Sequence, residues 1–150
     1  IDVQLCSIKF TKMKTLLIVL AATYAVSCSN THTKSNIEIP AVVKLTLQKN
    51  YQNAEELKWE KENSNYEASF EFDKTEYSLL IDSVGNILET EIEIKTNELP
   101  VEVKNYVAKN YADQKIKEAA KIIDNKGTVT YEAEVNDKDL IFDSNGNIIK

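Results

Sequence analysis

Few side chains of this 150-residue protein are of the kinds that carry out catalysis or bind metal ions. The sequence has one histidine, His32, and two cysteines, Cys6 and Cys28, and its other basic residues are all lysines. It therefore lacks the guanidinium group, which binds phosphates and carboxylates through two parallel hydrogen bonds. With so few candidates, neither a Ser–His–Asp nor a Cys–His arrangement is available. We predict no catalytic residues, no metal ligands and no cofactor, and we expect a non-enzymatic protein.

Carboxylates are the abundant reactive groups, since the chain has 24 Asp and Glu residues and a formal net charge of −6. Several glutamates alternate with other residues in segments that resemble strands, which places their side chains on one face. Such a face could attract a basic partner or loosely hold cations. It could equally be a solvated surface on which the glutamates pair with Lys58, Lys117 and Lys121. The candidate partner-binding residues are Glu67, Glu71, Glu89, Glu91, Glu93, Glu132 and Glu134.

Three other site types are not favoured by the sequence. An acidic chain lacks the basic surface that binds nucleic acid. General acid–base catalysis needs a carboxyl group whose pKa is raised by burial, whereas we expect these glutamates to be exposed. The segment from Asp143 to Asn147 is similar to the start of a calcium-binding loop. It lacks the spaced oxygen ligands and the closing glutamate, so it favours a hairpin turn.

The N-terminal part has the features of an export signal. Residues 13–27 combine Lys14 with a short apolar stretch and with small residues before Cys28. The apolar stretch is shorter than the ~20 residues of a membrane-spanning helix, so we interpret 13–27 as a signal peptide that takes no part in the fold. Residues 1–12 precede Met13. We interpret them as upstream translated sequence or an over-extended gene prediction.

Cys28 is the candidate lipid-attachment residue. The run from Ala25 to Cys28 resembles a bacterial lipobox, in which the cysteine is diacylated through its sulfur and becomes the mature N-terminus. Cleavage after Ser27 by an ordinary signal peptidase is the alternative. Residues 28–37 would then form a polar tether that contains His32. The chain without residues 1–27 has 15 lysines and 23 acidic residues, a net charge of −8. We expect an exported protein in the periplasm or outer membrane, held at the membrane by this lipid anchor.

The rest of the chain is a tandem repeat. Residues 39–51 align without gaps with residues 99–111, and six of the thirteen positions are identical. The tripeptide at 66–68 recurs at 131–133, and the turn-containing segment 82–88 recurs at 143–149. We place the first repeat at residues 38–96 and the second at 97–150. Units of this size are small for independent stability, so we expect them to share a core or a sheet.

Each repeat is predicted to begin with a helix and to continue with four strands. Pro40 and Pro100 suit the first position of a helix, and apolar residues follow them at three- and four-residue spacing. The period then changes to two, which is typical of half-buried antiparallel strands. The predicted fold class is α+β, with two tandem repeats of a helix and a four-stranded antiparallel sheet and with the helices packed on one face of the sheet. The expected strands lie around 57–59 and at 66–73, 77–81, 87–95, 115–124, 128–136, 139–143 and 147–149.

The order of these motifs is similar to that of the PepSY-like lipoproteins of Bacteroidetes. The shared features are a Leu-Pro pair before a helix that ends in Asn-Tyr, an aromatic-rich strand, and an Asp-x-x-Gly-Asn turn before the last strand. The resemblance covers about residues 38–150. It implies a fold like that of the β-lactamase-inhibitor protein, with the sheet open on the side away from the helices.

The resemblance also implies binding to an exported protein of unknown identity, as an inhibitor or modulator of a periplasmic or cell-envelope enzyme. The second hypothesis, from another class, is an envelope structural protein or a protein that binds cations or a small ligand.

Overall fold

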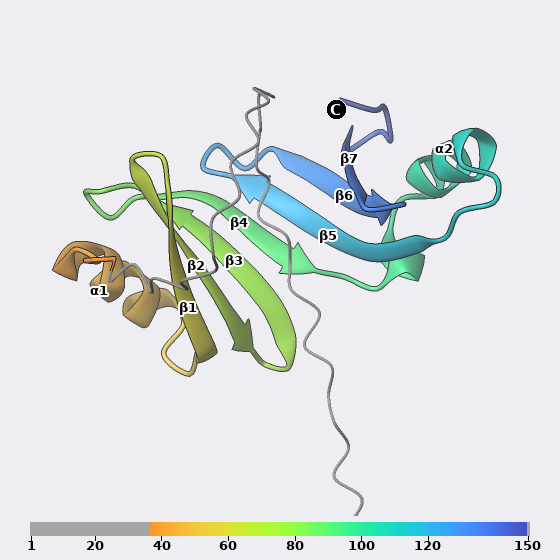
Figure 1. Ribbon diagram of the computed structural model, residues 1–150. Coiled ribbons are helices and arrows are strands. Elements are labelled where there is room, and N and C mark those ends of the chain that lie inside the picture. The colour runs from red at the N-terminus through yellow and green to blue at the C-terminus, as the bar shows by residue number, and fades with distance from the viewer. Residues whose placement is uncertain (1–36, 150) are drawn as a thin grey trace, which may run out of the picture. The chain divides into compact units, whose positions relative to one another are not determined.

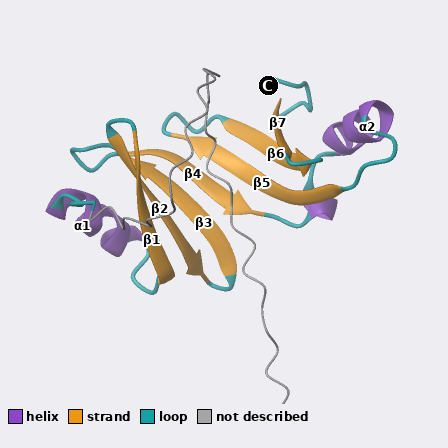
Figure 2. Cartoon of the chain, in the orientation of Figure 1, coloured by secondary structure: helices purple, strands orange, loops and turns teal. Residues whose placement is uncertain are grey.

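A computed structural model describes residues 37–149 of the chain. The predicted extension, signal peptide and tether therefore lie outside the described residues, except for Ile37, and so do Cys6, Cys28 and His32. The helices and strands follow one another along the chain as shown in Figures 1 and 2. They are α1 (Ala41–Asn50), β1 (Glu55–Glu62), β2 (Asn65–Phe72), β3 (Thr75–Ile81), β4 (Ile87–Glu93), the 3-10 helix η1 (Thr96–Glu98), α2 (Val101–Asn110), β5 (Ile116–Asp124), β6 (Val129–Val135) and β7 (Lys138–Asp143).

The seven strands form one antiparallel sheet in which the spatial order is the sequence order, β1 to β7. β4 and β5 pair across the boundary between the repeats, with Glu91 opposite Ile122. The two repeats therefore share one sheet, as their small size requires. The α+β class and the antiparallel sheet are confirmed.

Each helix covers the strands of its own repeat. α1 packs with residues of β2 and β3 in one buried cluster, and α2 packs with residues of β5, β6 and β7 in another. Leu79 of the first cluster is opposite Thr90, which is in turn opposite Ile123. Alternation along β5 puts Ala119 of the second cluster on the same side as Ile123. Both helices thus lie on one face of the sheet, as predicted.

The proline positions differ from the prediction by one residue. Pro40 and Pro100 immediately precede their helices instead of occupying the first helical position. The residues before them, Ile39 and Leu99, are buried in the two clusters. This pairing of a buried apolar residue with a proline fixes where each helix begins, because proline has no N–H to leave unsatisfied and its φ angle is restricted.

The predicted fourth strand of the second repeat is wrong for the described residues. Residues 147–149 make one isolated bridge, Phe142 to Ile148, and one hydrogen bond from the N–H of Ile149 to the carbonyl of Ile141, at 2.7 Å. The bridge is equivalent to the pair Ile81–Ile87, at which β4 begins. β4 continues because β3 and β5 pair with it on both sides, whereas this segment pairs with β7 alone.

Turns of one kind follow three of the strands, β3, β5 and β7. Asp82, Asp124 and Asp143 each accept hydrogen bonds from backbone N–H groups two and four residues later, at 2.8–3.0 Å. Hydrogen bonds from the side-chain amides of Asn86 and Asn147, together with these backbone bonds, hold the pKa of Asp82 and Asp143 below the usual value. The backbone bond from Thr128 is the main cause of the lowered pKa of Asp124. The sequence comparison identified the turns at Asp82 and Asp143 but missed the one at Asp124, where threonine replaces the final asparagine.

The turn after β3 is attached to α1. The hydroxyl of Thr46 donates a 2.8 Å hydrogen bond to the carbonyl of Gly85. We expect Thr46→Val to lower the free energy of unfolding by about 1 kcal/mol, because the similarly shaped valine leaves that carbonyl without its partner. Urea unfolding monitored by circular dichroism measures the effect. Thr90→Val is the control, because the described structure contains no side-chain hydrogen bond of Thr90, and an equal loss in both variants would contradict the prediction.

Candidate acidic binding face

The sheet face opposite the helices carries all seven predicted site residues. Glu67 and Glu89 both lie opposite Leu80, and Glu91 lies opposite Ser78. Alternation along the strands places the remaining four glutamates on the same side. We call this surface the acidic face. Its predicted members are Glu67, Glu71, Glu89, Glu91, Glu93, Glu132 and Glu134.

The expected exposure of these glutamates is wrong for most of them. Glu93 alone is exposed, Glu134 is buried with 9% of its surface accessible, and the other five are intermediate. The reason is that β5 carries apolar residues on both of its faces. Ala120 and Ile122, which point to the acidic face, are 5% and 8% exposed. The glutamates of β4 and β6 lie on either side of them and are shielded by close neighbours instead of standing free in solvent.

Glu67 and Ser78 form a buried polar pair on this face. The Ser78 hydroxyl donates a 2.7 Å hydrogen bond to Oε1 of Glu67. Oε2 of Glu67 is inaccessible to solvent and has no hydrogen-bond partner. Burial raises the pKa of Glu67, and the bond from Ser78 opposes that rise. An unsatisfied buried carboxylate oxygen has lost its hydration without compensation, so a proton or a cationic group there would be favourable.

The strongest pKa shifts occur near the middle of the sheet. Burial, followed by repulsion from Glu132 and Glu67, raises the pKa of Glu91 to about 8. Burial, followed by repulsion from Asp139 and Glu134, raises the pKa of Glu132 to about 7. The face therefore holds carboxyl groups that are partly protonated near neutral pH, because too many of them share one poorly hydrated surface.

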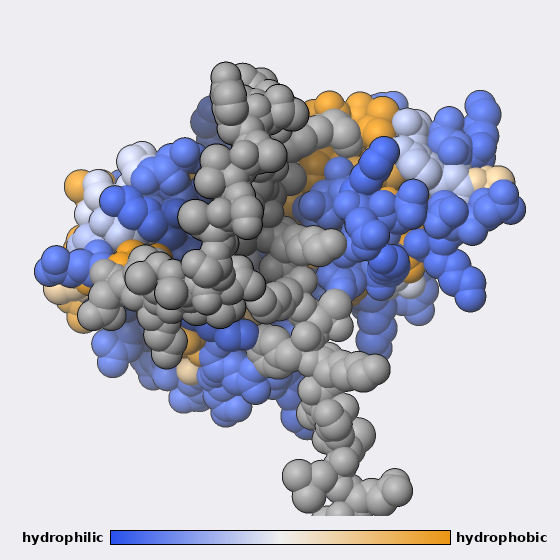
Figure 3. Space-filling view, viewed as in Figure 1, coloured by the Kyte–Doolittle hydropathy of each residue, from blue (hydrophilic) through white to orange (hydrophobic). Residues whose placement is uncertain are grey.

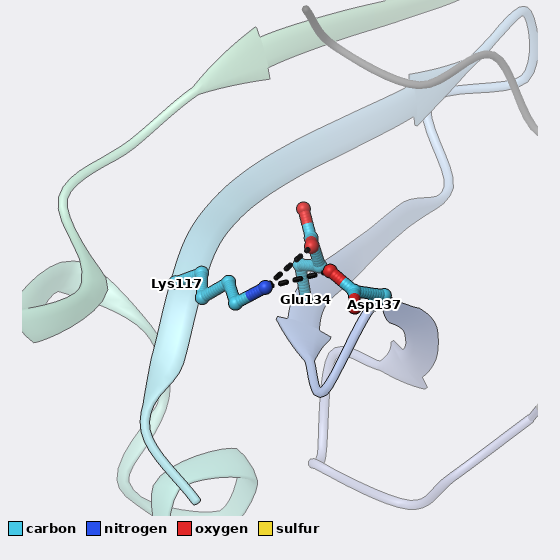
Figure 4. Close-up of polar contacts among 3 residues, drawn as sticks. All are labelled: Lys117, Glu134 and Asp137. Carbon is cyan, nitrogen blue, oxygen red and sulfur yellow. Dashed lines mark hydrogen bonds and ion pairs between the residues drawn. The ribbon is translucent and has the colours of Figure 1, made fainter. Parts of the chain in front are cut away.

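The lysines neutralise this charge only in part. Lys117 lies 3.8 Å from Oε1 of Glu134 and 2.6 Å from Oδ1 of Asp137, as Figure 4 shows. Lys58 is near enough to Glu76 to oppose the rise in its pKa. The expected pairing with Lys121 is wrong, since Lys121 is opposite Ile92 and Tyr131 and so points to the helix side of the sheet.

Three further carboxylates belong to the face and were missed from the sequence: Glu76, Glu118 and Asp139. Glu76 alternates with Ser78 on β3, a signal that the sequence does contain. Glu118 lies in an irregularity of the β5–β6 pairing, between Ile116 and Ala119, where simple alternation gives no prediction.

The rest of the described chain suggests no other chemistry. Within residues 37–149, no three His, Cys, Asp or Glu side chains are grouped so that they could hold a metal ion. None of the helices in this part of the chain has the length and apolar character needed to cross a membrane. Hydrophilic residues predominate over the described surface visible in Figure 3.

Fold and face together define a class of protein: a duplicated α+β module whose sheet has one helix-covered side and one acidic side. Residues 24–89 and 82–150 each match the family described as "Putative beta-lactamase-inhibitor-like, PepSY-like". The chain belongs to this family and contains two of its repeats, in agreement with the resemblance drawn from the sequence motifs.

Solved structures from Bacteroides share the fold. A DUF2874 family protein from Bacteroides uniformis is 22% identical, with a TM-score of 0.65 over 74% of this chain and 86% of its own. A protein from Bacteroides eggerthii described as a "putative periplasmic" protein is 16% identical, with a TM-score of 0.68 over 75% and 87%. A BLIP-like protein from Bacteroides fragilis is 24% identical, with a TM-score of 0.61 over 77% and 86%. No curated protein matches the sequence.

Proposed function

We propose that this protein is a non-enzymatic binding protein, exported and lipid-anchored at Cys28, whose acidic face binds a basic surface of another exported protein. Inhibition or modulation of a cell-envelope enzyme is the role that we infer for this binding. The observation that carries the proposal is the excess of half-buried carboxylates on a sheet face that neither helix covers. The family description and the periplasmic relative support the inhibitor role and the exported location.

The electrostatics of the face suit a basic partner. The carboxylates repel one another, and burial deprives them of part of their hydration, so their charge is poorly compensated in the free protein. A lysine or arginine side chain placed between Glu91 and Glu132 would replace repulsion by attraction. The apolar side chains of Ala120 and Ile122 lie beside these carboxylates and would add buried apolar contact.

Capture of exported proteins from a periplasmic extract on the immobilised mature chain tests the proposal. We expect the triple variant Glu89→Gln/Glu91→Gln/Glu132→Gln to retain its partner at least about tenfold less well, because each substitution removes a carboxylate that is not exposed. The amount retained is measured by quantitative mass spectrometry. Glutamine keeps the size and the hydrogen-bonding oxygen of glutamate.

The matched control is Glu38→Gln/Glu102→Gln/Asp113→Asn, which removes three carboxyl groups from exposed positions outside the acidic face. It should retain the partner as the unaltered chain does. A loss of binding in both triple variants would indicate an effect of net charge alone. Retention by both would contradict a role for the acidic face.

A further inference from the structure

Three exposed apolar side chains lie together on the other side of the molecule, at α1 and the turn that follows β3. Val42 and Leu45, three residues apart on α1, are 42% and 61% exposed, and Val84 of the turn is 69% exposed. The turn touches the helix at Val42, since a Cβ on Gly85 would be 2.8 Å from Val42 Cγ2. We call these three residues the α1 patch. Hydrophobic surface is visible over α1 and the neighbouring turn in Figure 3.

The second repeat shows that the fold does not require apolar residues here. In the alignment of the two repeats, Val42 corresponds to Glu102, Leu45 to Asn105 and Val84 to Asn145. All three counterparts are polar and exposed. Two copies of one structural unit thus differ at the same solvent-facing positions. An exposed apolar group at these three positions, present in the first repeat alone, indicates a contact with something outside the described fold.

The charged residues of α1 differ in sign from the net charge of the protein as a whole. The charged side chains of α1 are those of Lys44 and Lys49, with no carboxylate among them. Next to the patch is an open groove of about 640 Å³. Its polar lining consists of Thr46, Lys49, Asn50, Asp82, Asn86 and Asn125. Apolar side chains beside lysines and amides suit the interface of an anionic lipid bilayer, where acyl chains lie under negatively charged headgroups.

We propose that the α1 patch rests on the anionic surface of the membrane to which the protein is anchored. The inference depends on the lipid attachment at Cys28 that forms part of the proposed function. Ala41 is thirteen residues beyond Cys28, a distance of ~20 Å for a flexible chain and at most ~45 Å when extended. α1 is therefore the first described element within reach of the bilayer. The acidic face, on the opposite side of the sheet from α1, points away from the like-charged lipids.

The acetylation rate of Lys49 by a soluble reagent tests this contact. The mature chain, residues 28–150, is coupled through its one thiol, Cys28, to maleimide lipid in vesicles of phosphatidylethanolamine and phosphatidylglycerol. We expect acetylation of Lys49 to be about threefold slower than in the same chain coupled to a soluble maleimide. Lys109, the equivalent residue of α2, is the internal control and should react at an unchanged rate. Unchanged reaction of Lys49, or equal slowing at both lysines, would overturn the proposal.

The variant Val42→Glu/Leu45→Asn/Val84→Asn gives α1 the residues of the second repeat and should restore the rate at Lys49. Its thermal unfolding shows whether the fold is retained. If sedimentation shows a dimer that these substitutions abolish, the patch belongs to a second copy and the proposal is wrong.

Because coupling supplies the anchor chemically, these results do not depend on acylation in the cell. Palmitate labelling of Cys28 tests that part separately, and capture through the acidic face should be unchanged in the variant.

Discussion

Gly146→Ala is expected to lower the free energy of unfolding by about 3 kcal/mol or more. Gly146 has a φ of +80°, a conformation that costs alanine roughly 1–2 kcal/mol. Its new Cβ would also overlap with Cβ of Glu102 and lie 3.1 Å from the backbone nitrogen of Val103. Relief of that overlap requires the turn to move away from α2, an overpacking cost of about 1–3 kcal/mol. Chemical denaturation measures the loss, which would be a large share of the 5–15 kcal/mol typical of a domain.

The other two glycines supply graded controls for this prediction. Gly127 has a φ of +83° with nothing within 4 Å of an added Cβ, so Gly127→Ala should show the conformational cost alone. Gly85→Ala should fall between the two, because its nearest neighbours are the side-chain atoms Val42 Cγ2 at 2.8 Å and Thr46 Oγ1 at 3.0 Å. Equal losses for the Gly127 and Gly146 variants would show that the turn does not press on α2.

Glu91→Gln is expected to stabilise the protein above pH 8. The pKa of Glu91 is raised to about 8 in the folded protein from an ordinary value of 4.5. The folded state therefore binds a proton that the unfolded state has released, and the stability this gives is present below pH 4.5 and lost as the pH rises to about 8. A gain on the order of 2–4 kcal/mol at pH 9 follows for glutamine, which never ionises.

Unfolding free energies measured from pH 3 to pH 9 check this expectation. In the unaltered chain they should decrease from pH 5 to pH 8.5, because Glu132 contributes with the same sign as Glu91. They should also decrease below pH 3.8, where Asp82, Asp124 and Asp143, whose pKa values are lowered, become protonated. The control Glu93→Gln, at the exposed end of the same strand, should keep the decrease at high pH. If the decrease in Glu91→Gln is as large as in the unaltered chain, the assignment to Glu91 is wrong.

The internal repeat made much of the fold predictable from one sequence. The alignment of residues 39–51 with 99–111 predicted both helices, and strict alternation at 66–73 predicted β2 with its helix-facing side. The prediction failed where the strand pattern depends on neighbours. Residues 147–149 (Asn-Ile-Ile) align with residues 86–88 (Asn-Ile-Leu), at the start of β4, but β4 is paired on both sides and they are not.

The sequence predicted which glutamates belong to the acidic face but not how far they are buried. Alternation alone puts Glu89, Glu91 and Glu93 on one side of β4. The partial burial of Glu89 and Glu91 depends on β5, where Ala119 and Ala120 are both buried on opposite sides of the sheet, a pattern in which alternation gives no signal. The ion-pair partner of Lys117 could not be predicted from the sequence either, because its 2.6 Å contact is with Asp137, in the turn that leads into β7.

The sheet order has a consequence for how the protein folds. Every strand pairs with its immediate predecessor in sequence. All pairings other than β4–β5 therefore join segments that are close along the chain. The β4–β5 connection is the exception in length, and it carries η1 and α2. Low contact order of this kind favours rapid folding. The chain can add one strand at a time to a growing sheet, so that β1 to β4 can be complete under α1 before the second repeat is added.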